Sequence, residues 1–398
     1  MYEINVTHNI NTSPWDIPLT ERSRYLREIV DSGRRVTMII YEFPDTSTFR
    51  YRGYNIYQTM KNSQKWGTVY FFRHELDTAA VFLKDVDIVT ISRVKWNHQL
   101  QLFIDKVKDM GIPVIFDVDD RIYDMDYLPL VTNTLNVDFK TAPEVSYDFW
   151  FAQISRIEMT ARQADAYIGT NAFLQDTFRK RFGKKGYIIP NFLNDEQVEM
   201  SRLCLAQKKE YKKPFVIGYF SGTPSHINDF KLVYKDIMTL LYENDDIFLD
   251  VVGFMEFPRE MDELIKVGKV RFTNLVDFVK LQELIAGVDV NIVPLVTNDF
   301  TDCKSELKFF EAAIVDTITC ASPSFTYRNS IKHGETGFLC NQADWYSTIY
   351  DIYKKKYDVK KIIDNAHKYA IDRYYGSKVT TIIEEVYDSI MEDSTHVS

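Results

Sequence analysis

The chain has 398 residues, of which 45% are hydrophobic and 14% aromatic, and it carries a net charge of -9. A chain of this length exceeds what one hydrophobic core usually supports, so we expect two packed globular domains. The negative charge argues against nucleic acid or a broad anionic lipid surface as a partner, because binding to either needs an excess of Lys and Arg.

The first half of the chain alternates predicted helices with predicted strands. Helices are predicted over 18–29, 97–110, 147–163 and 172–182, and residues 125–142 are interpreted as a loop. Short runs rich in apolar and β-branched residues, of the kind that a parallel sheet buries, predict strands at 36–41, 67–72, 86–91, 112–116, 166–170 and 187–190.

Two arginines follow the first predicted strand. The run FPDTSTFRYRGYN places Arg50 and Arg52 in a loop at the carboxyl edge of the sheet, where open α/β folds bind their ligands. Contact with a sugar or an acceptor is one interpretation of these residues. A surface loop whose arginines form salt bridges is an equally good one.

The strand over 112–116 ends in DVDDRIYD, which brings four carboxylates close together. They could hold a divalent cation, contact a sugar hydroxyl or act as a base, or cap the next helix and pair with Arg121. We favour a sugar or acceptor contact by Asp119 or Asp120, because the end of the strand directs this segment into the cleft expected between the two domains. A DxD string alone is a weak metal pattern, so no metal site is predicted.

The second half repeats the alternation. Strands are predicted at 215–220, 248–253, 270–272, 288–294 and 317–322, with helices between them, including 280–285 and 307–314. The loop SGTPSHINDF (221–230) joins a strand to a helix start near Asn228 or Asp229, and it offers the glycine and small hydroxyl residues that a phosphate site needs. Polar residues between Asn191 and Pro214 place a domain boundary there. The sequence therefore predicts an α/β protein with two doubly wound parallel sheets.

The cysteines and the absence of long apolar runs bear on the compartment. Cys204, Cys303, Cys320 and Cys340 show no CxxC spacing, and no signal peptide precedes the first periodic segment. No apolar stretch approaches the roughly 18–20 residues that cross a bilayer. We expect buried thiols in a cytoplasmic protein, with any membrane contact peripheral to the inner face. Lysine runs within 208–213 and 354–361 could touch such a membrane, although solvated helix faces explain most runs of this kind.

Several segments resemble GT-B glycosyltransferases, and within them the retaining family 4 enzymes. The likeness covers most of residues 110–345 and is carried by IGYFSGTPSHINDF, VDVNIVPL, KSELKFFEAAIVDTITCAS with its GETGFL tail, ADAYIGTNAFL and IIPNFLND. The resemblance implies the GT-B fold. It implies an acceptor-binding domain over 1–195, a nucleotide-sugar domain over 196–375, and a helix over 376–398 that packs back on the first domain.

The resemblance also assigns donor contacts. In the family, the glutamate that opens the EA(A or M) helix contacts the donor ribose, and that position is Glu311 here. A carboxylate suits this role because it accepts hydrogen bonds from vicinal hydroxyls. The family's other glutamate falls on Cys303, so Asp302 or Glu306 is expected in its place, with Ser305 as a further donor contact.

The leaving diphosphate of such a donor needs a cation. Relatives commonly supply an arginine and a lysine near the first strand of the C-terminal domain, and SGTPSHINDF contains neither. Lys304 is therefore expected to neutralise the diphosphate, assisted by the backbone at Gly222 and Thr223 and by His226. Asp119 stands roughly where many relatives place a histidine, and we expect it to hydrogen-bond a donor-sugar hydroxyl.

The sequence is thus interpreted as a glycosyltransferase that moves a sugar from a nucleotide diphosphate sugar to a hydroxyl on a glycan, glycolipid or glycoprotein. The resemblance implies retention, with no metal or other cofactor and with Asp119, Lys304 and Glu311 at the reaction centre. The Cys303 departure and the missing arginine and lysine keep open a non-catalytic homologue that scaffolds an active transferase. A nucleotide-sugar epimerase is a third reading.

Overall fold

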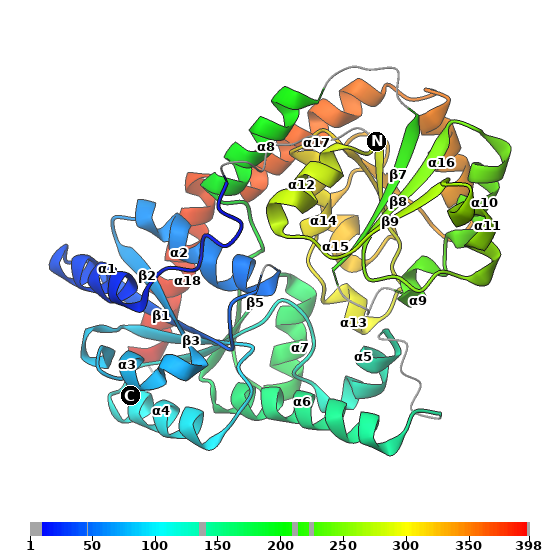
Figure 1. Cartoon of the computed structure of the whole chain (residues 1–398). Helices are drawn as coiled ribbons and strands as arrows, with labels where there is room; N and C mark the ends of the chain where they lie inside the picture. The colour runs from blue at the N-terminus through cyan, green and yellow to red at the C-terminus, as the bar shows by residue number, and fades with distance from the viewer. Residues whose placement is uncertain (1–9, 46, 135–140, 209–213, 223–226, 396–398) are drawn as a thin grey trace.

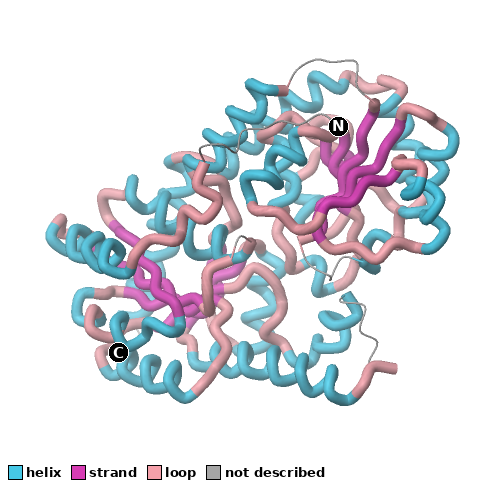
Figure 2. Tube along the Cα trace, in the orientation of Figure 1, coloured by secondary structure: helices cyan, strands magenta, loops and turns pink. Residues whose placement is uncertain are grey.

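The computed structural model describes residues 10–45, 47–134, 141–208, 214–222 and 227–395. Its strands form two separate sheets of six parallel strands each. Helices cover both faces of each sheet, as Figure 2 shows with the strands in magenta and the helices in cyan. The prediction of two doubly wound parallel sheets is therefore confirmed.

The first sheet takes its strands from the first half of the chain, in the order β2-β1-β3-β4-β5-β6. These strands are β1 (Arg35–Tyr41), β2 (Trp66–Phe72), β3 (Ile88–Ser92), β4 (Val114–Asp117), β5 (Ala166–Gly169) and β6 (Gly186–Ile188). The helices of this half are α1 (Leu19–Asp31), the π-helical segment η2 (Arg50–Tyr54), α2 (Asn55–Thr59), α3 (Leu76–Ala79), α4 (His98–Asp109), α5 (Leu128–Thr134), α6 (Glu144–Gln163), α7 (Ala172–Phe182) and α8 (Asp195–Gln207).

The second sheet has the order β12-β11-β10-β7-β8-β9. Its strands are β7 (Phe215–Ser221), β8 (Ile247–Gly253), β9 (Val270–Thr273), β10 (Val290–Val293), β11 (Ile318–Ala321) and β12 (Phe338–Leu339). The helices that follow α8 are α9 (Ile227–Phe230), α10 (Tyr234–Glu243), α11 (Asp262–Lys266), α12 (Phe278–Ala286), α13 (Asp299–Asp302), α14 (Leu307–Ala313), α15 (Phe325–Ser330), α16 (Trp345–Tyr353), α17 (Val359–Tyr374) and α18 (Ser377–Thr395).

Local sequence explains where several of these helices begin and end. The Asn97 side chain caps α4 by accepting a hydrogen bond from the backbone N–H of Leu100 at 2.8 Å. Asn171 caps α7 in the same way, through the N–H of Leu174 at 2.9 Å. Gly183 ends α7 in the left-handed conformation, with φ of +68°.

The last helix, α18, lies against the first sheet although it follows the second sheet in the chain (Figure 1). The indole N–H of Trp66 donates to Asp388 Oδ1 at 2.9 Å, and the rings of Trp66 and Tyr387 are 5.3 Å apart. Ser63 Oγ also donates to Glu384 at 2.5 Å. These contacts fasten the end of the described chain to β2 and to the turn before it.

Two stretches that we did not predict to be helical contain helices. Residues 125–142 were interpreted as a loop, yet they include α5, whose Leu128 and Val131 pack with residues of α6 and α13 in one buried cluster. The polar stretch before Pro214 contains α8, which buries only a few side chains. Both helices depend on tertiary packing more than on a strong apolar periodicity, so the sequence pattern is weak.

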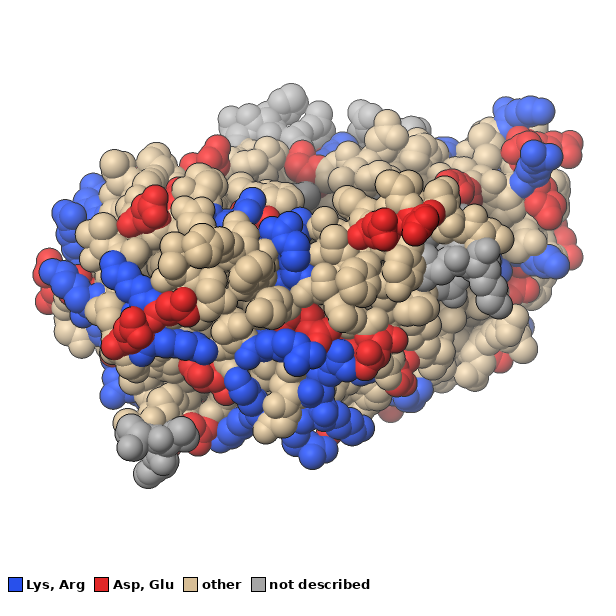
Figure 3. All heavy atoms as spheres, turned by 90° about the horizontal axis from the view of Figure 1, so that it is seen from below, with Lys and Arg blue, Asp and Glu red and all other residues tan. Residues whose placement is uncertain are grey.

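The four cysteines are free and buried, which confirms that part of the prediction. No described helix combines the length and the apolar character needed to cross a membrane. One lysine of each of the two runs has a partner within the protein. Lys208 donates to the carbonyls of Val315 and Asp316, and Lys356 pairs with Asp351 at 2.7 Å. Figure 3, which views the molecule from below, shows Lys and Arg gathered at the lower middle of that view, with Asp and Glu beside them, so this region carries mixed charge.

Candidate functional site

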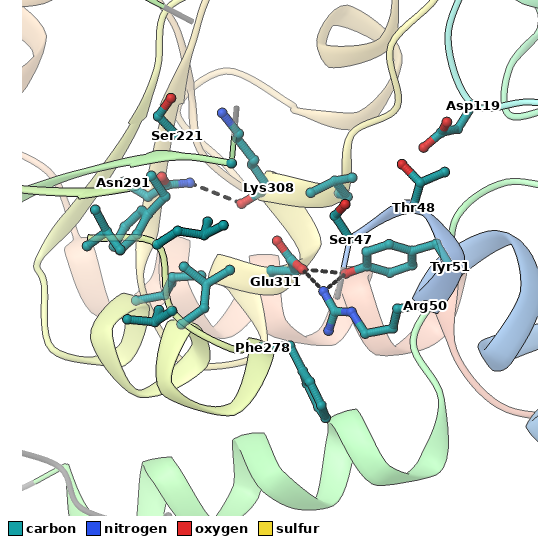
Figure 4. A pocket seen from close by; sticks show the side chains of 18 residues that line it. Ser47, Thr48, Arg50, Tyr51, Asp119, Ser221, Phe278, Asn291, Lys308 and Glu311 are labelled. Carbon is teal, nitrogen blue, oxygen red and sulfur yellow. Dashed lines mark hydrogen bonds and ion pairs between the residues drawn. The ribbon is translucent and has the colours of Figure 1, made fainter. Parts of the chain in front are cut away.

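A cavity of about 170 Å³ lies between the two sheets, where their carboxyl edges face each other. Residues from both halves of the chain line it. The first half contributes Ser47, Thr48, Arg50, Tyr51 and Asp119. The second half contributes Phe220, Ser221, Gly222, Val252, Leu275, Val276, Phe278, Leu281, Ile285, Asn291, Leu307, Lys308 and Glu311. Figure 4 shows these side chains from close by.

The cavity has an apolar wall and a polar side. The wall is formed by the ends of β7 and β8, the residues after β9, and helix α12, through Phe220, Val252, Leu275, Val276, Phe278, Leu281 and Ile285. The polar groups come from η2 and the two residues Ser47 and Thr48 before it, from α14, from Asn291 of β10, and from the carboxyl ends of β4 and β7. An apolar wall beside a few fixed polar groups suits a ligand with one flat, poorly hydrated end and one strongly polar end.

One glycine sets the shape of the edge behind this wall. Gly253 has φ of +106°, and a Cβ at this position would lie 1.7 Å from the carbonyl oxygen of Ser221. The same oxygen accepts a hydrogen bond from the N–H of Phe254 at 3.1 Å. The ends of β7 and β8 can therefore approach this closely only because residue 253 has no side chain.

Glu311 lies on α14 at the boundary between the apolar wall and the polar side. Its side chain accepts two hydrogen bonds at the same oxygen, Oε1: one from Arg50 Nη2 at 2.8 Å and one from the hydroxyl of Tyr51. The Tyr51 oxygen in turn accepts from Arg50 Nη2 at 3.0 Å and from Gln197 Nε2 at 3.1 Å. Burial raises the pKa of Tyr51 well above its usual value, so this phenol stays protonated and acts as the donor to Glu311.

Lys308 also lines the cavity, three residues before Glu311 on the same helix. Residues at this spacing share one face of a helix, and Figure 4 shows both side chains at the cavity. Burial, and next the charge of Lys304, lower the pKa of Lys308 to about 8. Among the described residues, no salt bridge involves Lys308, whereas Arg50, which also lines the cavity, is paired with Glu311.

Lys304, which we expected at the diphosphate, does not line the cavity. It lies in the turn between α13 and α14, and its ammonium lies over the ring of Phe300, 5.0 Å from the centroid. Its backbone carbonyl accepts from Thr326 Oγ1 at 2.5 Å and from Asn171 Nδ2 at 3.3 Å, which holds the turn in place. The lysine in the first turn of the helix is Lys308, and the sequence analysis did not single it out.

Asp119 lines the cavity as predicted from its place after β4, and it is paired with a cation of its own. Arg93 Nη1 lies 2.9 Å from Asp119 Oδ1 and 3.8 Å from Asp120 Oδ2. Arg93 has φ of +55°, a left-handed conformation in which its side chain reaches both carboxylates. Burial raises the pKa of Asp120, with Arg93 acting in the opposite direction. Asp120 is not among the residues that line the cavity.

The other two interpretations of the acidic run DVDDRIYD were a salt bridge to Arg121 and a divalent cation. Arg121 pairs with Asp124 at 2.8 Å, which is the salt bridge that we considered. Among the described residues, no group of three or more His, Cys, Asp or Glu side chains is arranged to hold a metal ion. The carboxylates of this run are thus paired with arginines, and Asp119 and Asp120 share one of them, Arg93.

Arg52 lies away from the cavity, contrary to the expected sugar or acceptor contact. Its side chain is fully buried and forms a two-pronged ion pair with Asp117, through Nε at 3.0 Å and Nη2 at 2.5 Å. Nη1 donates to the carbonyl of Ile189 at 2.7 Å and to Asn191 Oδ1 at 3.2 Å. The segment is also π-helical and buried, whereas we predicted a loop.

Ser305 and Glu306 also lie outside the cavity lining. Ser305 Oγ accepts from Asn191 Nδ2 at 2.9 Å. Glu306 is 4% exposed, its Oε1 accepts from the hydroxyl of Tyr374 at 2.8 Å, and burial raises its pKa. These contacts join the turn before α14 to the segment that follows β6 and to α17.

Of the remaining predicted site residues, Gly222 lines the cavity, whereas Thr223 and His226 lie outside the described residues. Cys303, where the family has a glutamate, is buried in an apolar cluster with Phe116 and Tyr123, and burial raises the pKa of its thiol. The sequence analysis missed several lining residues, namely Ser47, Thr48, Tyr51, Ser221, Asn291, Lys308 and the apolar wall. The spacing of Lys308 and Glu311 on one helix was the available signal for the lysine.

No family model and no curated protein matches the chain. Solved structures do. Anabaena HepE in complex with UDP and glucose is 13% identical over 90% of this chain and 100% of that chain, with a TM-score of 0.56. The values for sucrose-phosphate synthase from Thermosynechococcus elongatus are the same. A glycosyltransferase from Rickettsia africae is 13% identical over 90% of this chain and 99% of that chain, with a TM-score of 0.58. The chain therefore has the GT-B fold, and at these identities the likeness establishes the fold alone.

Proposed function

We propose that the protein is a glycosyltransferase whose donor is a nucleoside diphosphate sugar. The observation that carries this proposal is the cavity between the two sheets, where an apolar wall meets the Glu311 carboxylate and the Lys308 ammonium on one helix face. A nucleobase is flat and poorly hydrated, a ribose offers two hydroxyl donors, and a diphosphate is an anion, so the three parts match the three kinds of surface. The HepE structures with UDP and with UDP-glucose support the same assignment.

In this proposal, residues 196–375 bind the donor, residues 1–195 bind the acceptor, and the helix within 376–398 belongs with the first domain. The base packs on the wall around Phe278 and the ribose bonds to Glu311. The diphosphate lies beside Lys308 and the backbone of Gly222. The transferred sugar then points toward Asp119, which is the lining residue at the carboxyl end of β4.

The reaction follows from this placement. The acceptor hydroxyl oxygen forms a bond to the anomeric carbon, and the bond from that carbon to the β-phosphate oxygen breaks. The positive charge of Lys308 stabilises the diphosphate as negative charge grows on the leaving oxygen. We propose that configuration is retained, that a donor phosphate oxygen takes the proton of the acceptor, and that turnover needs no metal. Retention would appear as an α-linked product from an α-linked donor.

A second candidate is a non-catalytic homologue that binds a nucleotide sugar or a partner without transfer. The observation that favours it is the buried Cys303 at the position where relatives carry a carboxylate. The two candidates share the cavity and differ in turnover alone.

The test is to incubate the purified protein with UDP-, GDP- and ADP-sugars and a panel of hydroxyl acceptors, with and without EDTA, and to measure release of the nucleoside diphosphate. Lys308→Met and Glu311→Ala should each lower transfer by at least about tenfold, equal to about 1.4 kcal/mol of transition-state stabilisation. Lys356→Met is the matched control, because Lys356 is exposed and pairs with Asp351 at the surface. Unchanged turnover in both site variants would refute the assignment, and nucleotide binding without any release would favour the non-catalytic candidate.

A further inference from the structure

The carboxylate proposed to bind the ribose is held by residues from the other half of the protein. Arg50 and Tyr51 belong to η2, on the side of the first sheet, whereas Glu311 belongs to α14, beside the second sheet. All three side chains are buried, with exposed fractions of 5%, 1% and 3% respectively. This contact therefore links the two halves inside the wall of the cavity.

Hydrogen bonds connect the three side chains through Arg50 Nη2, whereas Arg50 Nε is buried without a hydrogen-bond partner among the described residues. Arg50 Nη2 donates to both Glu311 Oε1 and the Tyr51 oxygen, and Gln197 of α8 donates to that same oxygen. The Arg50 guanidinium also lies over the rings of Tyr51 and Phe278, at 4.5 Å and 5.1 Å from their centroids. Charge-assisted hydrogen bonds in a buried setting are strong and directional, so the orientation of Glu311 is determined by these neighbours.

Both hydrogen bonds from η2 fall on one oxygen of the carboxylate. Oε1 accepts from Arg50 and Tyr51, and no hydrogen bond between described residues uses Oε2. Figure 4 shows this second oxygen pointing away from Arg50 and toward the part of the cavity beside Lys308. A ligand hydroxyl in the cavity therefore meets one carboxylate oxygen, at a fixed place and in a fixed direction.

From this geometry we infer that Arg50 and Tyr51 are positioning residues that set the selectivity of the site for ribonucleotides. They occupy Oε1 of Glu311 and so present Oε2 to a ribose hydroxyl. This inference rests on the proposed function. It adds that the site in the second half distinguishes ribose from deoxyribose only when η2 of the first half contacts Glu311. A site arranged in this way rejects a deoxyribose, because Oε2 then stays buried without a donor.

Tyr51→Phe removes one donor from Oε1 and leaves the ring and its packing. The Glu311 carboxylate then has one hydrogen bond fewer at Oε1 and can rotate. Either of its oxygens can then bind water or the ligand hydroxyl. We expect the preference for ribose over deoxyribose to fall by about tenfold, the equivalent of one hydrogen bond to a charged group. Arg50→Met should reduce the preference in the same direction, and Arg50→Lys should restore part of it by returning a cationic donor.

Tyr54→Phe is a matched control from the same π-helical segment. Tyr54 is also buried, but its hydroxyl donates to Glu196 at 2.6 Å and it does not line the cavity. The variant thus loses one tyrosine hydroxyl hydrogen bond between η2 and α8 without touching Glu311. Its ratio of ribonucleotide to deoxyribonucleotide affinity should equal that of the unmodified protein.

The experiment is isothermal titration calorimetry of the full chain with UDP, GDP and ADP, each beside its 2′-deoxy and 3′-deoxy analogue. The inference is supported if the unmodified protein prefers a ribonucleotide and this preference falls in Tyr51→Phe but not in Tyr54→Phe. It is overturned if Tyr51→Phe and Arg50→Met keep the preference, or if they weaken ribo- and deoxyribonucleotides equally, as a merely structural role would. Absence of binding to every nucleoside diphosphate by the unmodified protein would instead refute the proposed function, and with it this inference.

Discussion

Lys308 gives the proposed nucleotide site a pH dependence that can be measured. Burial lowers the pKa of its ammonium to about 8, so in the free protein it is charged below that pH and loses its proton above it. A diphosphate binds the charged form, because the neutral amine offers no opposite charge. Affinity for a nucleoside diphosphate should therefore be full near pH 7 and should decrease as the pH rises through about 8.

The size of the effect follows from the pKa. Each pH unit above the pKa of the free protein lowers the charged fraction about tenfold, which corresponds to about 1.36 kcal/mol of binding free energy until the neutral form carries the remaining affinity. Between pH 7 and pH 9 the affinity should thus fall by about tenfold. The phosphate itself adds little to this change, because its second pKa is about 6 and it is already ionised.

The assay is calorimetric titration with a nucleoside diphosphate between pH 7 and pH 9.5 at constant ionic strength. Lys308→Arg keeps its charge over this range and should bind with little dependence on pH, which also controls for any titration of the base. Lys308→Met should bind weakly at every pH. Full affinity of the unmodified protein up to pH 9.5, or equal affinity in Lys308→Met, would show that this lysine does not contact the diphosphate.

Three further predictions concern stability. Arg52→Met should lower the unfolding free energy by about 3–5 kcal/mol in urea titrations, since it leaves the buried Asp117 carboxylate without its cation; a loss below about 1 kcal/mol would contradict this. Burial raises the pKa of Glu306 above its ordinary 4.5, so the folded chain loses stability as the pH rises from that value. Glu306→Gln should therefore melt at a higher temperature than the unmodified protein at pH 8, with a smaller difference at pH 5; a lower melting temperature at pH 8 would count against it. Gly253→Ala should lower the melting temperature sharply or prevent folding, because its Cβ would lie 1.7 Å from the Ser221 carbonyl oxygen; a folded variant with unchanged melting would disprove that close approach.

Elements with signals at both ends were predicted well from the sequence. The bounds of α7 agree with the prediction of a helix over 172–182, because Asn171 caps its first turn and Gly183 ends it at φ of +68°. Most strands were found within a few residues, since buried parallel strands are continuous apolar runs. The missed helix α5 has no such signals: Leu128 and Val131 pack in one cluster with Ile154 of α6 and Phe300 of α13, and α13 is distant in the sequence.

The site was predicted less completely, because its side chains are brought together from positions that are far apart in the sequence. Glu311 and Asp119 were assigned to the cleft from a resemblance and from a strand end, and both line the cavity. Lys304 was predicted as the diphosphate cation and Lys308 was not considered, although Lys308 has the helical spacing to Glu311 and lines the cavity. The turn that carries Lys304 directs its ammonium over Phe300, and only the fold around α13 reveals this.

Arg50 and Arg52 show what a local pattern leaves undecided. Arg50 and Arg52 lie two positions apart on a helical segment. Side chains at this spacing point in different directions, so the two arginines cannot both contact one ligand. Arg52 turns to the first sheet and pairs with Asp117, whereas Arg50 turns to the second half and pairs with Glu311. One short segment is thus anchored in one sheet by a buried ion pair, and from that anchor it extends a second arginine to the carboxylate of the other half. A rigid anchor is what a positioning role requires, because Arg50 can fix the direction of Glu311 only if its own place is determined independently of the ligand.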